Sequence, residues 1–242
     1  MSIHFLNCLS IRPYFPRVIG GVTALLVETA QGPVLVDSGI GTRDYQSKGF
    51  MRLFLIAMRS RFDLNETALY QARRLGFKPE EVRHIIQTHM HYDHADGLPD
   101  FPHAQVHLYK PEYDYIMNRP GWEFYPTHWA HGPIWVVHEL KGEKWFDFDA
   151  IHLDGFEPEM WLIPLTGHTP GHAGVAVKRE RGWVLYGSDA LPFNVLVDEI
   201  PDRISKIFNG PHIPRVREFM KSHPEVQVVG AHMALEFYEA IS

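Results

Sequence analysis

The chain has 242 residues, 45% hydrophobic and 21% charged, which is the composition of a folded globular protein and excludes disorder. Lys and Arg total 23 and Asp and Glu total 29, a net charge of −6 without a basic block, so we expect no nucleic-acid partner and no membrane partner. The longest apolar run, Leu53 to Met58, is far shorter than the ~18 residues that span a bilayer. The single cysteine, Cys8, excludes an internal disulfide, and the first residues lack the pattern of a signal peptide. We therefore expect a cytoplasmic protein with one domain over residues 1–242.

Short apolar runs bounded by Gly, Pro, Asp or His recur along the chain and predict nine strands. In chain order these are Val22–Val27, Val34–Val36, His84–Gln87, Gln105–Tyr109, Ile134–Val137, Trp161–Pro164, Ala173–Val177, Trp183–Tyr186 and Val226–Val229. Several are apolar almost throughout, which is typical of strands that are covered on both faces.

Helical patterns lie between these strands. Asp63 and Glu66 resemble a capping box, and apolar residues at helical spacing then continue until Gly76, which is expected to end the helix. Two further amphipathic helices are expected at Ile213–Ser222 and Ala234–Ile241. Strands with interspersed helices in both halves predict a layered α/β sandwich rather than an all-β barrel.

Two segments are richer in apolar and aromatic side chains than a surface connection needs. Residues 41–61 contain the run Phe50–Met58, and residues 111–148 contain Trp122 among several tryptophans. Each side chain taken alone could belong to the core. Taken together, they predict two cap-like segments that form the wall of a ligand pocket, since such pockets are lined with aromatic and apolar groups.

The motif richest in chemistry is Thr88–Gly97, which reads T-H-M-H-Y-D-H-A-D-G and follows a predicted strand. His89 and His91 can point the same way from an extended turn, while Asp93 and His94 can face a second point nearby. Imidazole nitrogens and carboxylate oxygens are the ligands that suit zinc and similar divalent ions. The motif therefore predicts a metal site.

Three later groups place further candidate ligands just beyond predicted strands. His168 lies in the sequence G-H-T-P-G-H, Asp189 follows the strand Trp183–Tyr186, and His232 follows the strand Val226–Val229. Because α/β sheets gather their site residues at the ends of strands, we expect these three side chains to join the first motif.

Together, H-x-H-x-D-H, G-H-x-x-G-H, an isolated Asp after a strand and a late His resemble the metallo-β-lactamase superfamily. The segment Val34–Gly39 resembles the early strand-Asp-x-Gly element of that superfamily, and the match runs from about Val22 to His232. The resemblance implies a four-layer αββα sandwich with the metal ions at one edge between the two sheets.

The resemblance also implies a role for each candidate residue. The seven ligands would form two groups that share one carboxylate: His89, His91 and His168 for the first ion, Asp93, His94 and His232 for the second, and Asp189 for both. Asp37 would lie behind the ligands and steady their loop, and His172 would be a structural hydrogen-bonding residue. The cofactors would be two divalent ions, zinc being expected, with iron, manganese or cobalt as alternatives.

Such a site is expected to hydrolyse its substrate with a hydroxide that bridges the two ions, because metal binding lowers the pKa of water from 15.7 to about 7. Asp93 would act as the catalytic residue that carries a proton to the leaving group. No serine or cysteine nucleophile is required.

Several activities of the superfamily fit this sequence less well. Members that hydrolyse β-lactams commonly have Cys or Ser in place of Asp189, and they are usually exported. Thioesterases of the glyoxalase II type have a basic C-terminal extension for which too few residues follow His232. Members that process RNA carry large insertions and basic clamps, which are expected to be absent here.

The N-acyl homoserine lactonases fit better, because they share the compact length, the late His232 and a hydrophobic segment like Phe50–Met58. We therefore expect a small ester or lactone as substrate, with an N-acyl homoserine lactone the best candidate. One departure is Pro192, where those lactonases often have a tyrosine, and Tyr92 or a tyrosine of the second cap-like segment could replace it. The alternatives are a phosphotriesterase, phosphoesterase or broad esterase, and a non-catalytic metal-binding sensor. The run Phe50–Met58 would also suit a homodimer contact.

Overall fold

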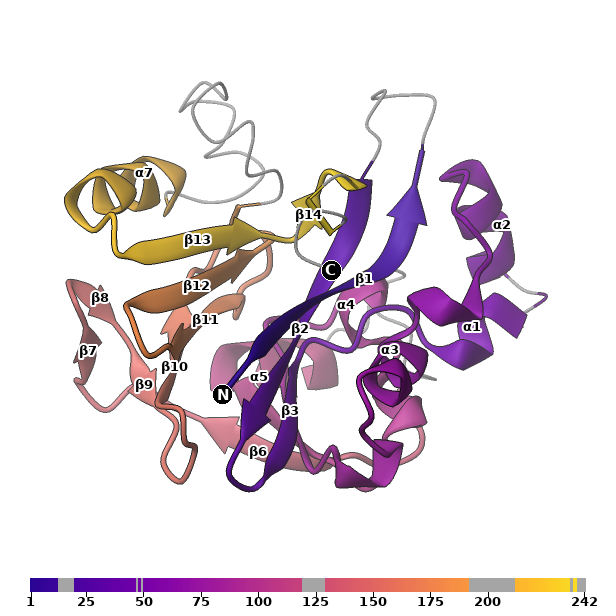
Figure 1. The fold of residues 1–242 in the computed structure, drawn as a ribbon, viewed down its shortest axis with the longest axis horizontal. Coiled ribbons are helices and arrows are strands. Elements are labelled where there is room, and N and C mark those ends of the chain that lie inside the picture. The colour runs from indigo at the N-terminus through magenta and orange to yellow at the C-terminus, as the bar shows by residue number, and fades with distance from the viewer. Residues whose placement is uncertain are drawn as a thin grey trace.

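Two β-sheets face each other in the computed structural model (Figure 1), which describes residues 1–12, 20–46, 48, 50–118, 129–191, 212–235 and 237–238. For residues 50, 51 and 54 only the backbone is described. All nine strands expected from the sequence are present, most of them longer by a residue or two.

The first sheet has the strand order β1-β2-β3-β4-β5-β6, with β14 beside β2. Its strands are β1 (Ile3–Ile11), β2 (Gly20–Thr29), β3 (Gly32–Val36), β4 (His84–Ile86), β5 (Gln105–Tyr109), β6 (Ile134–His138) and β14 (His232–Met233). The pairs from β3 to β6 are parallel, and Val36 pairs with Ile86. The residues that follow β3 and β4 therefore leave the sheet at the same edge.

The second sheet has the order β13-β12-β11-β10-β9. Its strands are β9 (Ile151–His152), β10 (Met160–Pro164), β11 (Ala173–Lys178), β12 (Trp183–Ser188) and β13 (Val226–Gly230). All its pairs are antiparallel except β12 with β13. A short hairpin of β7 (Lys144–Trp145) and β8 (Phe148–Asp149) forms a separate two-stranded sheet whose Trp145 and Phe148 pack in the core of the second sheet and helix α7 (His212–Ser222).

Helices cover the outer faces of both sheets (Figure 1). They are α1 (Thr42–Gln46), α2 (Phe50–Ala57), α3 (Ala68–Arg74), α4 (Tyr92–Ala95), α5 (Lys110–Asn118) and α7 (His212–Ser222), with 3-10 turns at Leu64–Glu66, Pro79–Glu81 and Leu98–Asp100. Within the described parts of the chain, no helix is both long and apolar enough to cross a bilayer.

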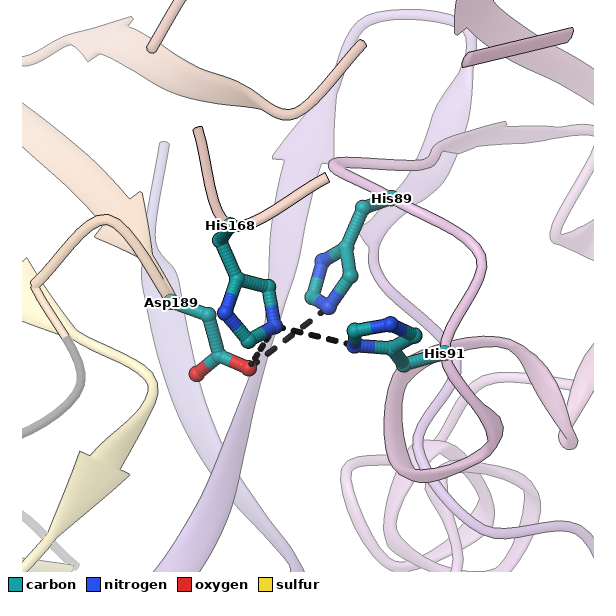
Figure 2. Close-up of side chains that lie close together, drawn as sticks. All are labelled: His89, His91, His168 and Asp189. Atoms are coloured by element: carbon teal, nitrogen blue, oxygen red, sulfur yellow. Dashed lines mark hydrogen bonds and ion pairs between the residues drawn. The ribbon is translucent and has the colours of Figure 1, made fainter. Parts of the chain in front are cut away.

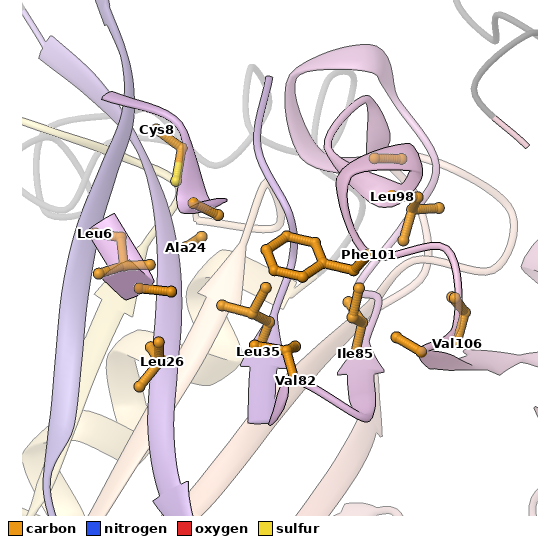
Figure 3. Close-up of a cluster of buried hydrophobic side chains, with 14 of the residues drawn as sticks. Leu6, Cys8, Ala24, Leu26, Leu35, Val82, Ile85, Leu98, Phe101 and Val106 are labelled. Carbon is orange, nitrogen blue, oxygen red and sulfur yellow. The ribbon is translucent and has the colours of Figure 1, made fainter. Parts of the chain in front are cut away.

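Three hydrophobic cores hold these layers together. Between the first sheet and its helices, Leu35 and Ile85 pack with Phe101 (Figure 3). The core between the sheets contains residues of β2, β3 and β4 on one side and of β10, β11 and β12 on the other, and Ile213, Val216 and Phe219 of α7 lie in the third core. Each fully buried Leu, Ile or Phe side chain contributes about 1.5–3 kcal/mol. The order helix, sheet, sheet, helix is the αββα sandwich expected from the sequence.

The helix expected to begin at Asp63 is divided into two pieces. Asp63 caps the 3-10 turn Leu64–Glu66, and α3 begins only at Ala68, with Thr67 as its N-cap. The capping-box interpretation is wrong because the carboxylate of Glu66 accepts hydrogen bonds from Ser10 instead, at 2.7 Å from its N–H and 2.8 Å from its hydroxyl. Ser10 lies where β1 bulges away from the register of β2, and the buried carboxylate pairs with the donor that the bulge releases.

The two cap-like segments contain more regular structure than a loop. Residues 41–61 form α1 and α2, and Leu55 of α2 packs with Tyr45 in a fourth, smaller core while Leu53 remains 67% exposed. In the second segment, Trp135 packs against the core beneath α3 and α5, and Trp145 lies in the core beneath α7. Trp145 is therefore a core residue and Trp135 a partly buried residue that packs against a core, while Trp122 lies outside the described residues.

The remaining helical expectations have different outcomes. The helix expected at Ile213–Ser222 is confirmed as α7. The one expected at Ala234–Ile241 falls partly outside the described residues, although Leu235, Phe237 and Tyr238 are helical.

Candidate metal centre

The turn after β4 carries four of the candidate ligands, and buried side chains hold it. The amide of Gln87 donates to the carbonyl oxygens of His89 and His94, at 2.8 and 2.9 Å. The short helix α4 begins after His91 and brings Asp93 and His94 to one side of the turn. The candidate ligands therefore come from a segment whose backbone is fixed from within.

The first group of candidate ligands is His89, His91, His168 and Asp189, whose side chains converge from two loops and a strand end (Figure 2). Nε2 of His168 lies 2.9 Å from Nδ1 of His91 and 3.0 Å from Oδ2 of Asp189. Nε2 of His89 lies 3.5 Å from the same carboxylate oxygen. One ligand atom from each of the four residues lies within 4.8 Å of all the others, so the four residues could hold a single ion.

The second group is Asp93, His94 and His232, which satisfy the same spacing. Nε2 of His94 and Nε2 of His232 each lie 3.9 Å from Oδ2 of Asp93. The carboxylate of Asp189 also reaches this group, because its oxygens lie 3.6 Å from His94 and 3.3 Å from His232. Asp189 is thus in contact with both groups, and all seven residues expected at the site are brought together.

Two residues at strand ends adopt left-handed backbone conformations beside this cluster. Asp37, directly after β3, has φ of 60°, and Ser188, the last residue of β12, has φ of 47°. Such conformations cost about 1–3 kcal/mol for a non-glycine residue and concentrate at functional sites. Ser188 directs Asp189 out of the sheet toward the imidazoles, so this strain serves the position of the shared carboxylate.

Asp37 braces the ligand turn from behind. Its buried carboxylate accepts hydrogen bonds of 2.8 Å each from the N–H of Thr88, the hydroxyl of Thr88 and Nδ1 of His94. Since Nδ1 of His94 donates to Asp37, its Nε2 faces the cluster and is the nitrogen that would bind a metal ion after losing its proton. The supporting contacts expected for Asp37 are therefore present.

The chemistry of the cluster fits divalent ions. Nε2 of His89 and Nε2 of His94 are buried and have no hydrogen-bond partner among the described residues. A buried polar atom left unpaired costs free energy, so a cluster that aims two such nitrogens at one carboxylate fits a bound cation. Five imidazoles and two carboxylates gathered in this way suit zinc, iron, manganese or cobalt.

The electrostatics of the cluster point the same way. Burial, together with the neighbouring His168, lowers the pKa of His91 to about 4. Burial also lowers the pKa of His94, but the carboxylates of Asp93, Asp189 and Asp37 outweigh it and raise that pKa to about 10. The carboxylates thus attract positive charge to a site that holds several buried imidazoles, and a metal ion can supply that charge in place of protons.

Two other residues considered in the sequence lie outside the ligand groups. Nδ1 of His172 donates to the carbonyl oxygen of Leu165 at 3.1 Å, as expected for a structural residue. Cys8 is fully buried, and burial raises the pKa of its thiol, so it is not poised as a nucleophile.

Glu112 of α5 is a buried residue beside the site that the sequence did not reveal. Its carboxylate accepts hydrogen bonds from the loops that carry His89, His91 and His168. A glutamate in the first turn of an amphipathic helix is ordinary in a sequence, so no local signal could have identified it.

Comparison with known proteins places the chain in a family. The model of the Metallo-beta-lactamase superfamily matches residues 17–232. The chain belongs to this superfamily. The expected resemblance is confirmed, and the superfamily's αββα fold is the one described above.

Relatives found by sequence agree on hydrolytic chemistry. A "probable metallo-hydrolase" of Mycobacterium tuberculosis is 38% identical over 233 residues, which cover 94% of this chain and 72% of that protein. An N-acyl homoserine lactonase of Bacillus thuringiensis is 25% identical over 174 residues, covering 70% of this chain and 63% of the lactonase. This chain is therefore a metal-dependent hydrolase of the superfamily.

The fold comparison is equally broad. The structure of a mutant of the B. thuringiensis lactonase AiiA, solved with N-decanoyl-L-homoserine at its active site, superposes with a TM-score of 0.73 over 99% of this chain and 96% of that chain at 21% identity. This likeness shows a shared fold. Pro192, the position where the lactonases often have a tyrosine, lies outside the described residues.

Proposed function

We propose that this protein is a dinuclear metal-dependent hydrolase that cleaves an ester or lactone. The observation that carries the proposal is the position of Asp189, whose two carboxylate oxygens contact imidazoles of both ligand groups, at 3.0 and 3.5 Å in the first and 3.6 and 3.3 Å in the second. A carboxylate so placed fits two ions that share one bridging ligand. Zinc is the expected metal, because imidazoles and carboxylates are ligands that it commonly takes.

Two ions bound in such a site would supply a hydroxide nucleophile at neutral pH and would polarise the bond under attack. The chain contributes the rest of the mechanism. His89, His91 and His168 hold one side of the reacting centre, and His94, braced by Asp37, holds the other. Water is excluded from the back of the site, because His89 and His94 are fully buried.

Asp93 is the residue we assign to proton transfer. Its carboxylate lies at the edge of the second group and its side chain is 14% exposed, whereas that of Asp189 is 6% exposed. A partly open carboxylate beside the reacting atoms can take the proton that remains on the hydroxide after its attack and pass it to the leaving oxygen. Asp189 is enclosed by imidazoles and is better suited to holding ions than to exchanging protons.

The substrate class rests on the relatives. N-acyl homoserine lactonases are among the chain's homologues, and a structure of the same fold holds a lactone-derived product at its active site. We therefore propose a lactone or small ester, with an N-acyl homoserine lactone as the first compound to test. A phosphoester is the alternative outcome.

A turnover screen of the metal-loaded protein tests this proposal. The panel would contain acyl-homoserine lactones of several chain lengths, simple lactones, aryl esters, thioesters and phosphotriesters. We expect the highest kcat/KM on a lactone or ester, with up to about a fourfold gain for each methylene that becomes fully buried. The best rate on a phosphotriester, or no turnover at all, would overturn the substrate assignment.

The role of Asp93 has its own test. Asp93→Asn keeps an oxygen for the metal but cannot carry the proton, so its loss of kcat should be large for a lactone and smaller for a 4-nitrophenyl ester, whose leaving group needs no proton. Asp100→Asn is the matched control, because Asp100 accepts hydrogen bonds from Thr42 and lies outside both ligand groups. Equal losses on both substrates would reassign Asp93 to metal binding alone.

A further inference from the structure

Glu112 joins the two loops that supply the first group of ligands. It lies in the first turn of α5 and has no exposed surface. Its Oε1 accepts a hydrogen bond from the N–H of Met90 at 3.0 Å, and its Oε2 accepts from the hydroxyl of Thr169 at 2.6 Å and from the N–H of Gly171 at 3.1 Å. One carboxylate therefore receives three donors from two segments that are far apart in the sequence.

The donors are the immediate neighbours of the ligands. Met90 lies between His89 and His91, and Thr169 follows His168. Fixing the N–H of Met90 fixes the peptide that sets the spacing of the first two imidazoles. Fixing Thr169 and Gly171 fixes the loop that brings the third, so each histidine of the first group is one residue away from a donor to Glu112.

The loop packs directly on α5 at this point. A Cβ at Gly171 would lie 1.9 Å from the backbone nitrogen of Glu112 and 2.6 Å from its Cβ, which no side chain can tolerate. Glycine is thus required at position 171 by the close approach of the helix. This contact explains the second glycine of the G-H-T-P-G-H sequence, which metal binding itself does not need.

A fully buried carboxylate is costly unless charged hydrogen bonds replace its water. A core position would be served more simply by an apolar side chain. The second group has a similar device on its other side, since Asp37 accepts from Thr88 and His94. Glu112 thus lies behind the loops of His89, His91 and His168, while Asp37 holds His94 directly and reaches His89 only through the hydroxyl of Thr88.

We propose that Glu112 is a positioning residue that holds His89, His91 and His168 at the spacing of the first ion and so sets the affinity of that group alone. This inference rests on the proposed dinuclear function. The inference predicts that a change at Glu112 alters the affinity for one ion and not for the other. A residue that merely stabilised the fold would alter the affinity for both ions or for neither.

Glu112→Gln is the decisive variant. It preserves the size of the side chain, but its amide NH₂ must face at least one of the two backbone N–H groups, which cannot turn to accept. Glu66→Gln is the matched control, because Glu66 is also a buried glutamate that accepts from a backbone N–H and a hydroxyl, both of Ser10, and contacts neither ligand loop among the described residues.

The measurement is a stepwise titration of the metal-free protein with Zn²⁺ in competition with a chromophoric chelator. We expect two ions in the wild type and a fall of roughly 10–100-fold in the affinity for one of them in Glu112→Gln, with the other changed by less than about threefold. Excess Zn²⁺ should restore turnover in this variant, and Glu66→Gln should bind both ions as the wild type does.

A second background identifies which ion is affected. His168→Ala removes a ligand of the first group, so in that protein Glu112→Gln should no longer change the affinity for the ion that remains. If Glu112→Gln does not fold, Thr169→Val removes one of the three hydrogen bonds and should weaken the same ion by a smaller factor.

The possible failures are distinct. A wild type that binds fewer than two ions refutes the proposed dinuclear function, and the inference with it. A wild type that binds two ions while Glu112→Gln loses thermal stability and keeps both affinities leaves the function standing and refutes the positioning role.

Discussion

Among the residues that the structure describes, histidines gather in two places that differ in chemical character, and the first of them is the candidate metal centre. Beside the seven residues described above, His84, His107 and His138 form a row across β4, β5 and β6. Nδ1 of His84 lies 3.0 Å from Nε2 of His107, and Nδ1 of His107 lies 2.9 Å from Nε2 of His138. In the row, His107 uses both of its nitrogens on its neighbours, whereas at the metal centre the nitrogens converge on Asp189.

The pKa of a buried histidine is therefore shifted in opposite directions in the two places. Burial and its two histidine neighbours lower the pKa of His107 to about 3, so it is neutral at physiological pH. Three carboxylates raise the pKa of His94 to about 10 in spite of its burial. A cluster of imidazoles alone excludes charge, and the carboxylates are what make the other cluster attract a cation.

Removing the shared carboxylate should have the largest effect. Asp189→Ala takes away the group that both sets of imidazoles contact, so kcat/KM on the best substrate should fall by more than the 10–100-fold typical of an outer partner. Elemental analysis should show fewer than two ions per chain. Full activity with two ions would contradict the bridging role.

Removing the carboxylate behind His94 should have the next largest effect. Asp37→Asn replaces a carboxylate that accepts three hydrogen bonds with an amide that can no longer accept all of them. It also removes one of the negative charges near His94, which leaves His94, like His107 in the row, with less attraction for a cation. We expect the second ion to bind roughly 10–100-fold more weakly. Chelator competition measures this, and an unchanged affinity for both ions would show that His94 is oriented by the backbone alone.

Changes in the row of His84, His107 and His138 should alter the free energy of unfolding rather than the hydrolytic activity. The folded pKa of His107 is about 3 and its ordinary value is 6.5, so the unfolded chain binds the proton first as the pH falls. The row therefore contributes stability above about pH 6.5 and loses it as the pH falls toward 3. His107→Leu should cost about 1–3 kcal/mol at pH 7.5, because it removes two hydrogen bonds, and the difference from wild type should narrow at pH 5.

Urea unfolding at the two pH values measures that difference, with His103→Gln as a control at an exposed position. A gap between wild type and His107→Leu that widens on acidification would mean that the row accepts a proton in the folded state.

The smallest expected effect is none at all. Because the row lacks a point on which its nitrogens converge, Zn²⁺ titration should stop at two ions per chain and His107→Leu should leave that number unchanged. A third ion that is lost in this variant would make the row a second kind of metal site.

The sequence predicted the strands well and singled out the seven residues that the structure brings together, because both depend on local patterns. An apolar run reports its own burial, and H-x-H-x-D-H places four ligands in one turn. The roles of Glu66 and Glu112 could not be predicted from the sequence, since each carboxylate accepts hydrogen bonds from donors more than twenty residues away. The strand β1 was missed as well, because its bulge at Asn7 and Ser10 breaks the alternation that marks a strand.

The crossing from β13 to β14 has a consequence for the whole molecule. β13 belongs to the second sheet and β14 pairs with β2 of the first, and between them Ala231 donates to the carbonyl of Ser188 and accepts from the N–H of Thr23. His232 thus directly follows Ala231, whose backbone hydrogen bonds connect the two sheets. His89 follows a strand of the first sheet, and Asp189 follows a strand of the second. An ion held by these residues would therefore connect the two sheets. Metal binding and the packing of one sheet against the other would then be thermodynamically linked.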